Sequence, residues 1–184
     1  MRCPTFMVGY WNQPELTAQT LRGGWLHSGD VGKLDAEGNL YILDRLKDML
    51  VSNGFNVFPK EVENAVLIHP AVQLAGVVGI PDEIRGDTIH AFVTLKGGEP
   101  ANGRSLDELA AEILQDVRTR LAHYKWPRSI NIVRELPLTA TGKVRRFKLR
   151  EMRSSGDASE SMSDSVIGRA GDALVSSTRE GLAG

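Results

Sequence analysis

The segment that begins at Ser105 is the feature that most limits the possible folds. Ser105 and Glu108 have the spacing of a capping box, in which each side chain accepts a hydrogen bond from the other residue's backbone N–H at a helix start. Apolar residues then recur every three or four positions, at Leu106, Leu109, Ile113, Val117 and Leu121. A helix with one apolar face must bury that face against another element, so the pattern requires a partner layer.

Strand patterns predict that layer. Val72–Ile80 is rich in β-branched apolar residues, and Ile89–Leu95 is another apolar run that ends at a Gly-Gly turn. Ile130 and Ile132 alternate with polar neighbours, which predicts a short third strand. We therefore predict an α+β fold, a small mixed sheet with helices packed on it.

Two further elements are predicted upstream of this sheet. Pro59 suits the first turn of a helix, which Pro70 would end. The apolar face of that helix would be formed by Val62, Ala65, Val66 and His69. Val31–Leu34 and Leu40–Leu43 flank a tight Asp/Gly/Asn turn, which predicts a β-hairpin.

The end of the chain has a different composition. From Glu151 to Gly184, Ser, Gly and Asp recur and large apolar residues are few. Such a segment buries too little apolar surface to offset the entropy lost on ordering. We predict a mobile tail, with a short helix near Asp172–Thr178.

Charge and cysteine content narrow the functional classes. The formal net charge of −1 gives no general reason to expect nucleic acid or an anionic membrane as partner. The single cysteine, Cys3, excludes an internal disulfide and fits a reducing compartment. We find no leader and no apolar run long enough to span a bilayer, and predict a cytoplasmic protein without stable membrane insertion.

A lysine in the turn TATGK, at residues 139–143, is the first candidate for chemistry. A nucleotide-binding P-loop would need Gly at Pro137 and Ser or Thr at Val144, so that interpretation fails. Between Lys125 and Arg150 eight basic residues stand against one acid, Glu135, which is also compatible with a phosphate backbone. Few aromatic residues there could stack on bases, and a solvated basic face explains the charge equally well. We expect no nucleic-acid partner.

Three stretches together indicate a family. GGWLHSGD, LDRLKDMLVSNGFNVFPKEVE and PLTATGKVRR occur in this order. They resemble the last three core motifs of the adenylate-forming superfamily, which includes acyl-CoA synthetases, peptide-synthetase adenylation domains and luciferases. The segments GFNVFP and YKWPR are most similar to those of fatty-acid and aryl-acid CoA synthetases. The resemblance implies a carboxylic acid substrate, ATP with Mg²⁺, and coenzyme A.

The resemblance also assigns roles to single residues. Lys143 matches the catalytic lysine of adenylation, and a compact fixed cation suits the charge that develops when a carboxylate attacks the α-phosphate. Asp30 and Arg45 match residues that bind the nucleotide's sugar region. Lys47 matches the hinge about which the small domain rotates. Gly54 matches the CoA-side position, where a missing Cβ lets the pantetheine arm approach the backbone.

The remaining polar and aromatic residues of these motifs have ordinary explanations. Arg145 and Arg146 are expected to be supporting or surface charges, and Glu61 and Glu63 to cap or solvate their helix. The aromatic residues Phe55 and Phe58 are expected in the core. The four histidines lack metal-ligand spacing, so we predict no protein metal site, and Mg²⁺ would arrive with ATP.

The resemblance implies a division of the chain into three parts. Residues 1–45 would be a β-rich remnant of a large N-terminal adenylation domain, with poor order before Trp25. Residues 46–151 would be the small C-terminal lid domain, and residues 152–184 a disordered tail. The chain is thus expected to be the C-terminal portion of an acyl-CoA synthetase, inactive without the missing domain. The alternative is a non-catalytic interaction module that retains the lid fold.

Overall fold

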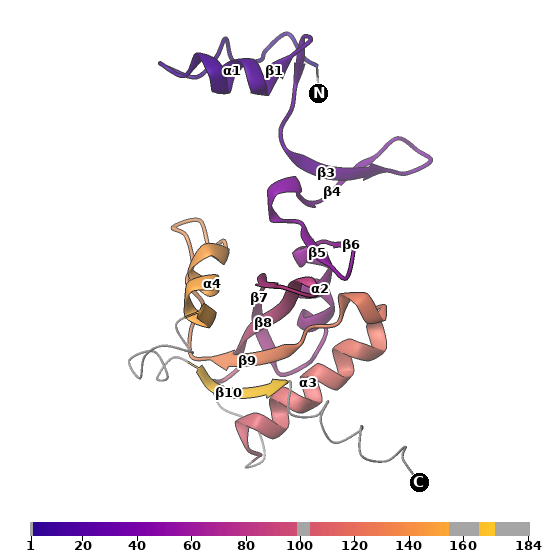
Figure 1. The fold of residues 1–184 in the computed structure, drawn as a ribbon, viewed down its shortest axis with the longest axis vertical. Helices are drawn as coiled ribbons and strands as arrows, with labels where there is room; N and C mark the ends of the chain where they lie inside the picture. Colours follow the sequence, from indigo (N-terminus) through magenta and orange to yellow (C-terminus); the bar gives the residue numbers. More distant parts are fainter. Residues whose placement is uncertain (1, 99–103, 155–165, 172–184) are drawn as a thin grey trace. The chain divides into compact units, whose positions relative to one another are not determined.

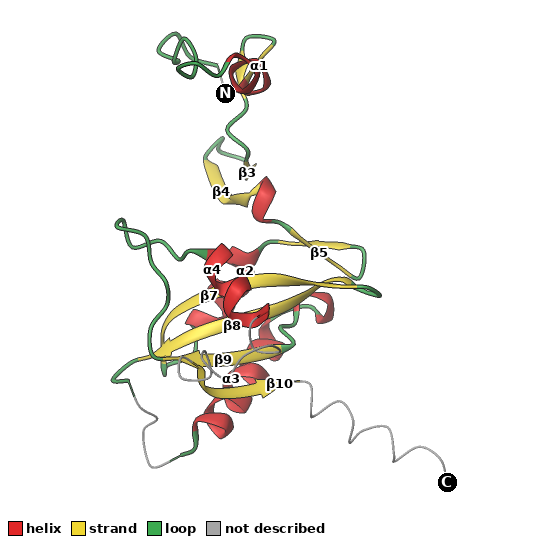
Figure 2. Cartoon of the chain, turned by 60° about the vertical axis from the view of Figure 1, so that its left-hand side comes forward, coloured by secondary structure: helices red, strands yellow, loops and turns green. Residues whose placement is uncertain are grey.

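The computed structural model describes residues 2–98, 104–154 and 166–171. The chain divides into two compact units, Met1–Asp48 and Met49–Gly184, which are treated separately below. None of the helices in the described ranges is both long and apolar enough to cross a bilayer. Figures 1 and 2 label most of the helices and strands.

The first unit contains one short helix and two antiparallel strand pairs. Helix α1 (Pro14–Thr20) is followed by β1 (Leu21–Arg22) and β2 (Trp25–Leu26), which pair with each other. Strands β3 (Asp30–Leu34) and β4 (Leu40–Arg45) pair as the predicted hairpin. A 3₁₀ turn, η1 (Leu46–Asp48), ends the unit.

The second unit is built on a six-stranded mixed sheet, which confirms the predicted fold class. Its strands are β5 (Leu50–Ser52), β6 (Phe55–Val57), β7 (Val72–Asp82), β8 (Gly86–Leu95), β9 (Ser129–Val133) and β10 (Val166–Gly171). The order is β10-β9-β8-β5-β6, with β7 also paired to β8. The β8–β9 pair is parallel and the other pairs are antiparallel.

Helices cover both faces of this sheet (Figure 2). Helices α2 (Pro59–Leu67) and α3 (Leu106–Arg120) pack with Val77 and the rest of the larger apolar cluster. Helix α4 (Arg146–Ser154) packs with Val78 and the smaller cluster. Successive residues of a strand point to opposite faces, which is why neighbours on β7 belong to different clusters. A 3₁₀ turn, η3 (His123–Lys125), precedes β9.

The helix starts follow their sequence signals. The capping box at α3 forms as predicted: Ser105 Oγ accepts the Glu108 N–H at 3.1 Å, and the Glu108 carboxylate accepts the Ser105 N–H at 3.0 Å. Helix α2 begins at Pro59 but ends at Leu67, so His69 lies beyond it. There His69 Nδ1 accepts the backbone N–H of Ala71 at 3.3 Å.

The prediction of a tail without structure is wrong for β10. This strand pairs with β9, Ala170 lies in the larger apolar cluster, and the Arg169 N–H donates to Asp107 at 2.8 Å. The edge of β9 would otherwise present unpaired backbone groups. A Cβ at Gly171 would lie 2.5 Å from the Arg128 carbonyl oxygen, so only glycine fits there. Helix α4 also extends past residue 151, and the helix predicted at 172–178 lies outside the described residues.

Candidate functional site

Lys143 lies on a short hairpin of residues 137–145, called here the lysine hairpin. The Gly142 N–H donates to the Thr139 carbonyl at 2.9 Å, and the Thr139 N–H donates to the Lys143 carbonyl at 2.7 Å. Gly142 has φ +76° and a Cβ there would meet nothing within 4 Å, so glycine is required by conformation rather than by space. The hairpin therefore holds the Lys143 backbone while its side chain is exposed.

The base of the lysine hairpin packs on the sheet. Leu138 and Val144 form a β-bridge, and the Arg145 N–H donates to the Pro137 carbonyl at 2.8 Å. A Cβ at Gly76 of β7 would lie 2.8 Å from Val144 Cγ1. The absence of a side chain on Gly76 thus allows the hairpin to approach the strand closely.

Glu63 and Arg146 form a largely buried ion pair beside this base, a contact that no local sequence signal predicts. Their side chains are 6% and 19% exposed. Arg146 Nη2 lies 3.1 Å and Nε 3.3 Å from Glu63 Oε1, which also accepts the Val77 N–H at 3.1 Å. The expectation that Glu63 caps or solvates its helix is wrong, since its carboxylate joins α2 to β7 and α4. Arg146 is a supporting charge, as expected, whereas Arg145 is exposed.

Gly54 lies at the tip of the β5–β6 hairpin. Asn53 and Gly54 have φ of +51° and +79°, as in a two-residue type I′ turn, for which Asn-Gly is a strong signal. A Cβ at Gly54 would meet nothing within 4 Å. The Gly54 position is thus open to solvent. The other residue of the turn is held in place, because the Asn53 N–H donates to the Arg85 carbonyl at 2.8 Å.

An aromatic pair and an ion pair lie next to this turn. The Phe55 ring, expected in the core, is instead 54% exposed and stacks on Tyr124 with centroids 4.6 Å apart. Lys125 of η3 forms an ion pair with Glu61 of α2. Partial burial lowers the pKa of Lys125, but the hydrogen bond and charge of Glu61 outweigh it and raise the pKa overall. These contacts connect η3 to β6 and α2. Phe58 is partly buried.

Asp30 and Arg45 face each other across the β3–β4 hairpin of the first unit. They are paired residues in the register, and Arg45 Nε lies 3.5 Å from Asp30 Oδ1. The Asp30 N–H donates to Ser28 Oγ at 3.2 Å, which holds the start of β3. Asp30 remains 29% exposed and Arg45 58% exposed, so both can contact a ligand. Lys47 follows on η1 with an exposed side chain, directly before the division between the units.

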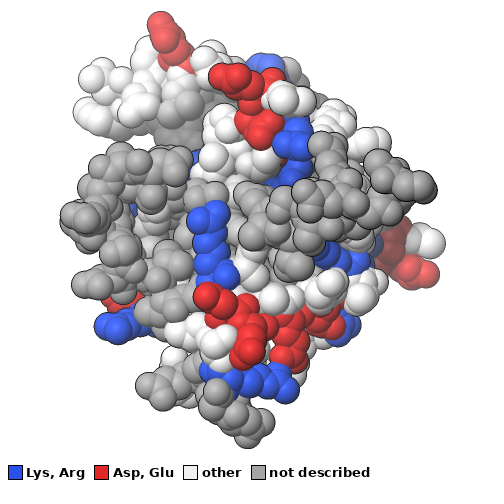
Figure 3. All heavy atoms as spheres, turned by 60° about the horizontal axis from the view of Figure 1, so that its bottom comes forward, with Lys and Arg blue, Asp and Glu red and all other residues white. Residues whose placement is uncertain are grey.

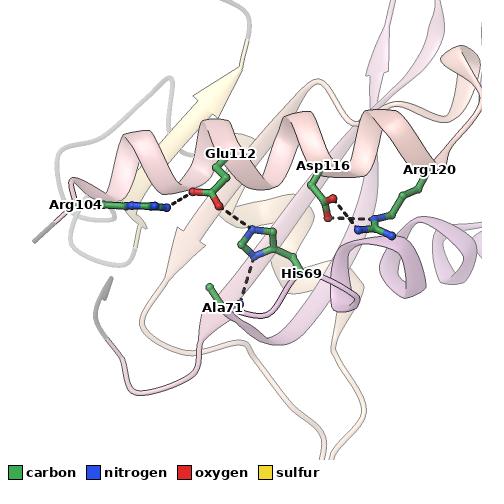
Figure 4. A network of polar contacts seen from close by, with 6 residues as sticks. All are labelled: His69, Ala71, Arg104, Glu112, Asp116 and Arg120. Atoms are coloured by element: carbon green, nitrogen blue, oxygen red, sulfur yellow. Dashed lines mark hydrogen bonds and ion pairs between the residues drawn. The ribbon is translucent and has the colours of Figure 1, made fainter. Parts of the chain in front are cut away.

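Two of the histidines, His69 and His90, have ring nitrogens in local hydrogen bonds. His90 is buried between Thr88 Oγ1 at 3.0 Å and Ser129 Oγ at 2.8 Å. His69 accepts a backbone N–H at Nδ1, so its other nitrogen, 3.6 Å from Glu112, carries the proton in the neutral ring (Figure 4). Within the described ranges no group of three His, Cys, Asp or Glu side chains is arranged to hold a metal ion.

The basic stretch 125–150 is partly neutralised by the fold. Lys125 and Arg146 pair with Glu61 and Glu63 of α2. The indole Nε1–H of Trp126 donates to the Leu121 carbonyl at 2.9 Å. The ion pairs of Lys125 and Arg146 favour a structural explanation for part of the basic charge of this stretch. Figure 3 draws one face of the molecule, on which acidic and basic side chains also lie next to one another.

Comparison with known proteins gives a family match and several relatives. Residues 61–143 match the family described as AMP-binding enzyme C-terminal domain. A long-chain-fatty-acid–CoA ligase of Bacillus subtilis is 48% identical over 148 residues, 80% of this chain and 25% of that protein. A feruloyl-CoA synthase of an Amycolatopsis species is 44% identical over 147 residues, 80% of this chain and 28% of that protein.

Solved structures show the same relation. The o-succinylbenzoate CoA synthetase of Bacillus subtilis, in complex with an acyl-adenylate intermediate, superposes with a TM-score of 0.70 at 37% identity. The match covers 81% of this chain and 29% of that chain. The chain therefore spans between a quarter and three tenths of the length of these relatives.

Proposed function

We propose that this chain serves an acyl-CoA synthetase, because residues 61–143 match the AMP-binding enzyme C-terminal domain family and the chain is similar to part of a CoA ligase and of a CoA synthetase of known structure. In the first half-reaction a carboxylate oxygen attacks the α-phosphorus of ATP, and the bond to pyrophosphate breaks. In the second, the thiol sulfur of coenzyme A attacks the acyl carbon, its proton leaves, and AMP departs. The chain would act together with an N-terminal adenylation domain.

The observation that carries the proposal is the lysine hairpin. Its backbone is fixed by three backbone hydrogen bonds, two of which form the Leu138–Val144 β-bridge, and by the Lys143 N–H, which donates to Thr139 Oγ1 at 3.1 Å. The Lys143 side chain is exposed to solvent. A cation held this way can stabilise the charge that develops between the carboxylate and the α-phosphate, and needs little rearrangement to do so. We assign Lys143 to adenylation on this basis.

The other assignments follow the division of the chain. Asp30 and Arg45, adjacent across one hairpin, would bind the nucleotide's sugar region. Lys47, next to the division between the units, would be the hinge residue that exchanges the two half-reactions. The open turn at Gly54 would face the pantetheine arm. Mg²⁺ would arrive on the phosphate oxygens of ATP, the hard ligands that it prefers.

Supporting observations come from the first unit. Leu34, Leu40 and Ile42 of the β3–β4 hairpin are 68%, 59% and 59% exposed. Apolar side chains gathered on one hairpin are typical of a surface that another domain covers. We also propose a reducing, cytoplasmic compartment, since Cys3 is an exposed free thiol.

ATP–pyrophosphate exchange tests the proposal. Residues 1–184 would be joined to the upstream part of the Bacillus subtilis long-chain-fatty-acid–CoA ligase and assayed with fatty, cinnamic-type and succinylbenzoate-type acids. We expect Lys143→Ala to lower exchange by about 100-fold or more, the usual effect of removing one transition-state charge contact. The control is Lys96→Ala, another exposed lysine of the same unit. If Lys143→Ala exchanges pyrophosphate as fast as the Lys96→Ala control, the role of Lys143 is contradicted. If the unsubstituted hybrid shows no exchange with any of the acids, an interaction module is favoured.

A further inference from the structure

We propose that the Glu63–Arg146 ion pair is a positioning element that fixes the lysine hairpin for adenylation. The inference rests on the proposed function for its catalytic consequence, whereas the coupling between the ion pair and the hairpin is testable without it. Neither residue is expected to touch the substrates. They would act through the backbone that carries Lys143.

The geometry of the pair is that of a built contact. Glu63 comes from α2 and Arg146 from the start of α4, 83 residues later in the sequence. One oxygen, Glu63 Oε1, accepts two donors of the Arg146 guanidinium and the Val77 N–H of β7. A single buried carboxylate thus connects three elements that meet beside the hairpin. A charge buried to this degree requires such partners.

The position of Arg146 runs against local helix preference. The first turn of a helix favours anions, because the N-terminal end of the helix dipole is positive. Helix α4 instead begins with Arg146, with Lys148 two residues on and no acid in its first turn. The Glu63 carboxylate supplies the missing negative charge from another helix. The start of α4 is therefore stabilised by a tertiary contact rather than by its own sequence.

The start of α4 is also the end of the lysine hairpin. The hydrogen bond from Arg145 to the Pro137 carbonyl closes the hairpin one residue before Arg146. Val144 contacts Gly76 of β7, the neighbour of Val77. A displaced Arg146 would therefore move the strand that carries Lys143. Misplacement of a reacting group by about 1 Å can cost on the order of 100-fold in rate.

Two variants separate charge from geometry. Glu63→Gln retains an amide oxygen that can accept the Val77 N–H but removes the charge. Arg146→Lys keeps the charge but loses the planar donors that converge on one oxygen. Asp116→Asn is the matched control, because Asp116 forms an ion pair with Arg120 on α3, 2.7 Å apart, without contact to the hairpin.

The first measurement is amide hydrogen exchange on the chain itself. We expect Glu63→Gln to accelerate exchange of the Gly142 and Arg145 amides by about tenfold, the effect of losing one charged hydrogen bond. The amides of α3 should be unchanged, and Asp116→Asn should leave the hairpin as in the parent chain. Uniform acceleration throughout the unit, or none in the hairpin, would overturn the coupling. If Glu63→Gln fails to fold by circular dichroism, Arg146→Lys decides the question in the same way.

The second measurement separates the half-reactions in the hybrid enzyme. We expect Glu63→Gln to lower kcat of pyrophosphate exchange by about 10- to 100-fold, without a matching change in the KM for ATP. Thioester formation from a preformed acyl-adenylate should be unchanged. Arg146→Lys, which keeps the charge, should lower kcat of pyrophosphate exchange less than Glu63→Gln does. An equal loss in both half-reactions would show a purely structural pair. If Lys143→Ala has no effect, the proposed function fails, while hydrogen exchange still judges the coupling.

Discussion

Replacement of Gly76 by alanine tests how closely the lysine hairpin and α4 pack on β7. A Cβ at this position would lie 2.7 Å from Leu149 Cδ1 and 2.8 Å from Val144 Cγ1. Carbon atoms in contact are normally about 3.5–4.0 Å apart, so each neighbour would have to withdraw by close to 1 Å. Leu149 is fully buried and Val144 is β-branched, which leaves both side chains little freedom to move.

The free energy of unfolding should fall by about 1–2 kcal/mol. Overpacking a core costs about 1–3 kcal/mol. Alanine recovers about 0.4–1 kcal/mol by restricting the unfolded chain. For a unit of this size the net change lowers the Tm by roughly 3–10 °C.

Thermal and urea unfolding of Gly76→Ala, Val144→Ala and the double variant would measure the effect. Removal of Val144 Cγ1 restores part of the space, so we expect a favourable coupling of at least about 0.5 kcal/mol in the double-mutant cycle. A Tm for Gly76→Ala equal to or above that of the parent chain would refute the packing argument. Strict additivity of the two substitutions would refute it as well.

Three further predictions concern the Gly142 turn and the N-terminal cap of α3. Gly142→Ala should lower the free energy of unfolding by about 1 kcal/mol through the φ of +76° alone, and Gly142→Asn by less, because asparagine tolerates the left-handed region better. Urea unfolding measures both changes. Equal stability of the parent chain and the two variants would contradict the argument. Loss of the cap in Ser105→Ala should cost about 1 kcal/mol. The hydrogen bond from the Ser105 backbone N–H holds the pKa of the Glu108 carboxyl below its usual 4.5. The contribution of this hydrogen bond to the free energy of unfolding is therefore complete above the unfolded-state pKa, and it is lost as the pH falls through the lowered folded-state pKa. Urea unfolding between pH 3 and 6 should therefore show that the free energy of unfolding falls less with acid in Glu108→Gln than in the parent chain. Identical pH profiles of the two proteins would speak against the contact.

The regular elements of the second unit were largely predictable from local signals. Ser105 and Glu108 marked the start of α3, and Pro59 marked the start of α2. Apolar runs located β7 and β8, although both are longer than predicted. The Asn53-Gly54 dipeptide is a signal for a two-residue hairpin turn, and the β5–β6 hairpin at this place was not among the predicted elements.

Predictions about burial were less successful. Phe55 was expected in the core and is exposed, whereas Glu63 was expected in solvent and is buried. The composition of residues 151–184 hid β10, whose small residues fit beside β9. Residue type predicts burial only on average, since the environment of a side chain depends on which other segments reach it.

The amino-acid sequence by itself determined the motif order, the α+β class and the turn that presents Lys143, because these depend on residues close together along the chain. Only the tertiary structure decided what holds that turn in place. Glu63 pairs with Arg146, and Gly76 lies against Val144 and Leu149, and nothing in the local sequence around these residues predicts either contact. Both contacts depend on the packing of α2, β7 and α4, and packing is a property of the folded chain rather than of any segment of it.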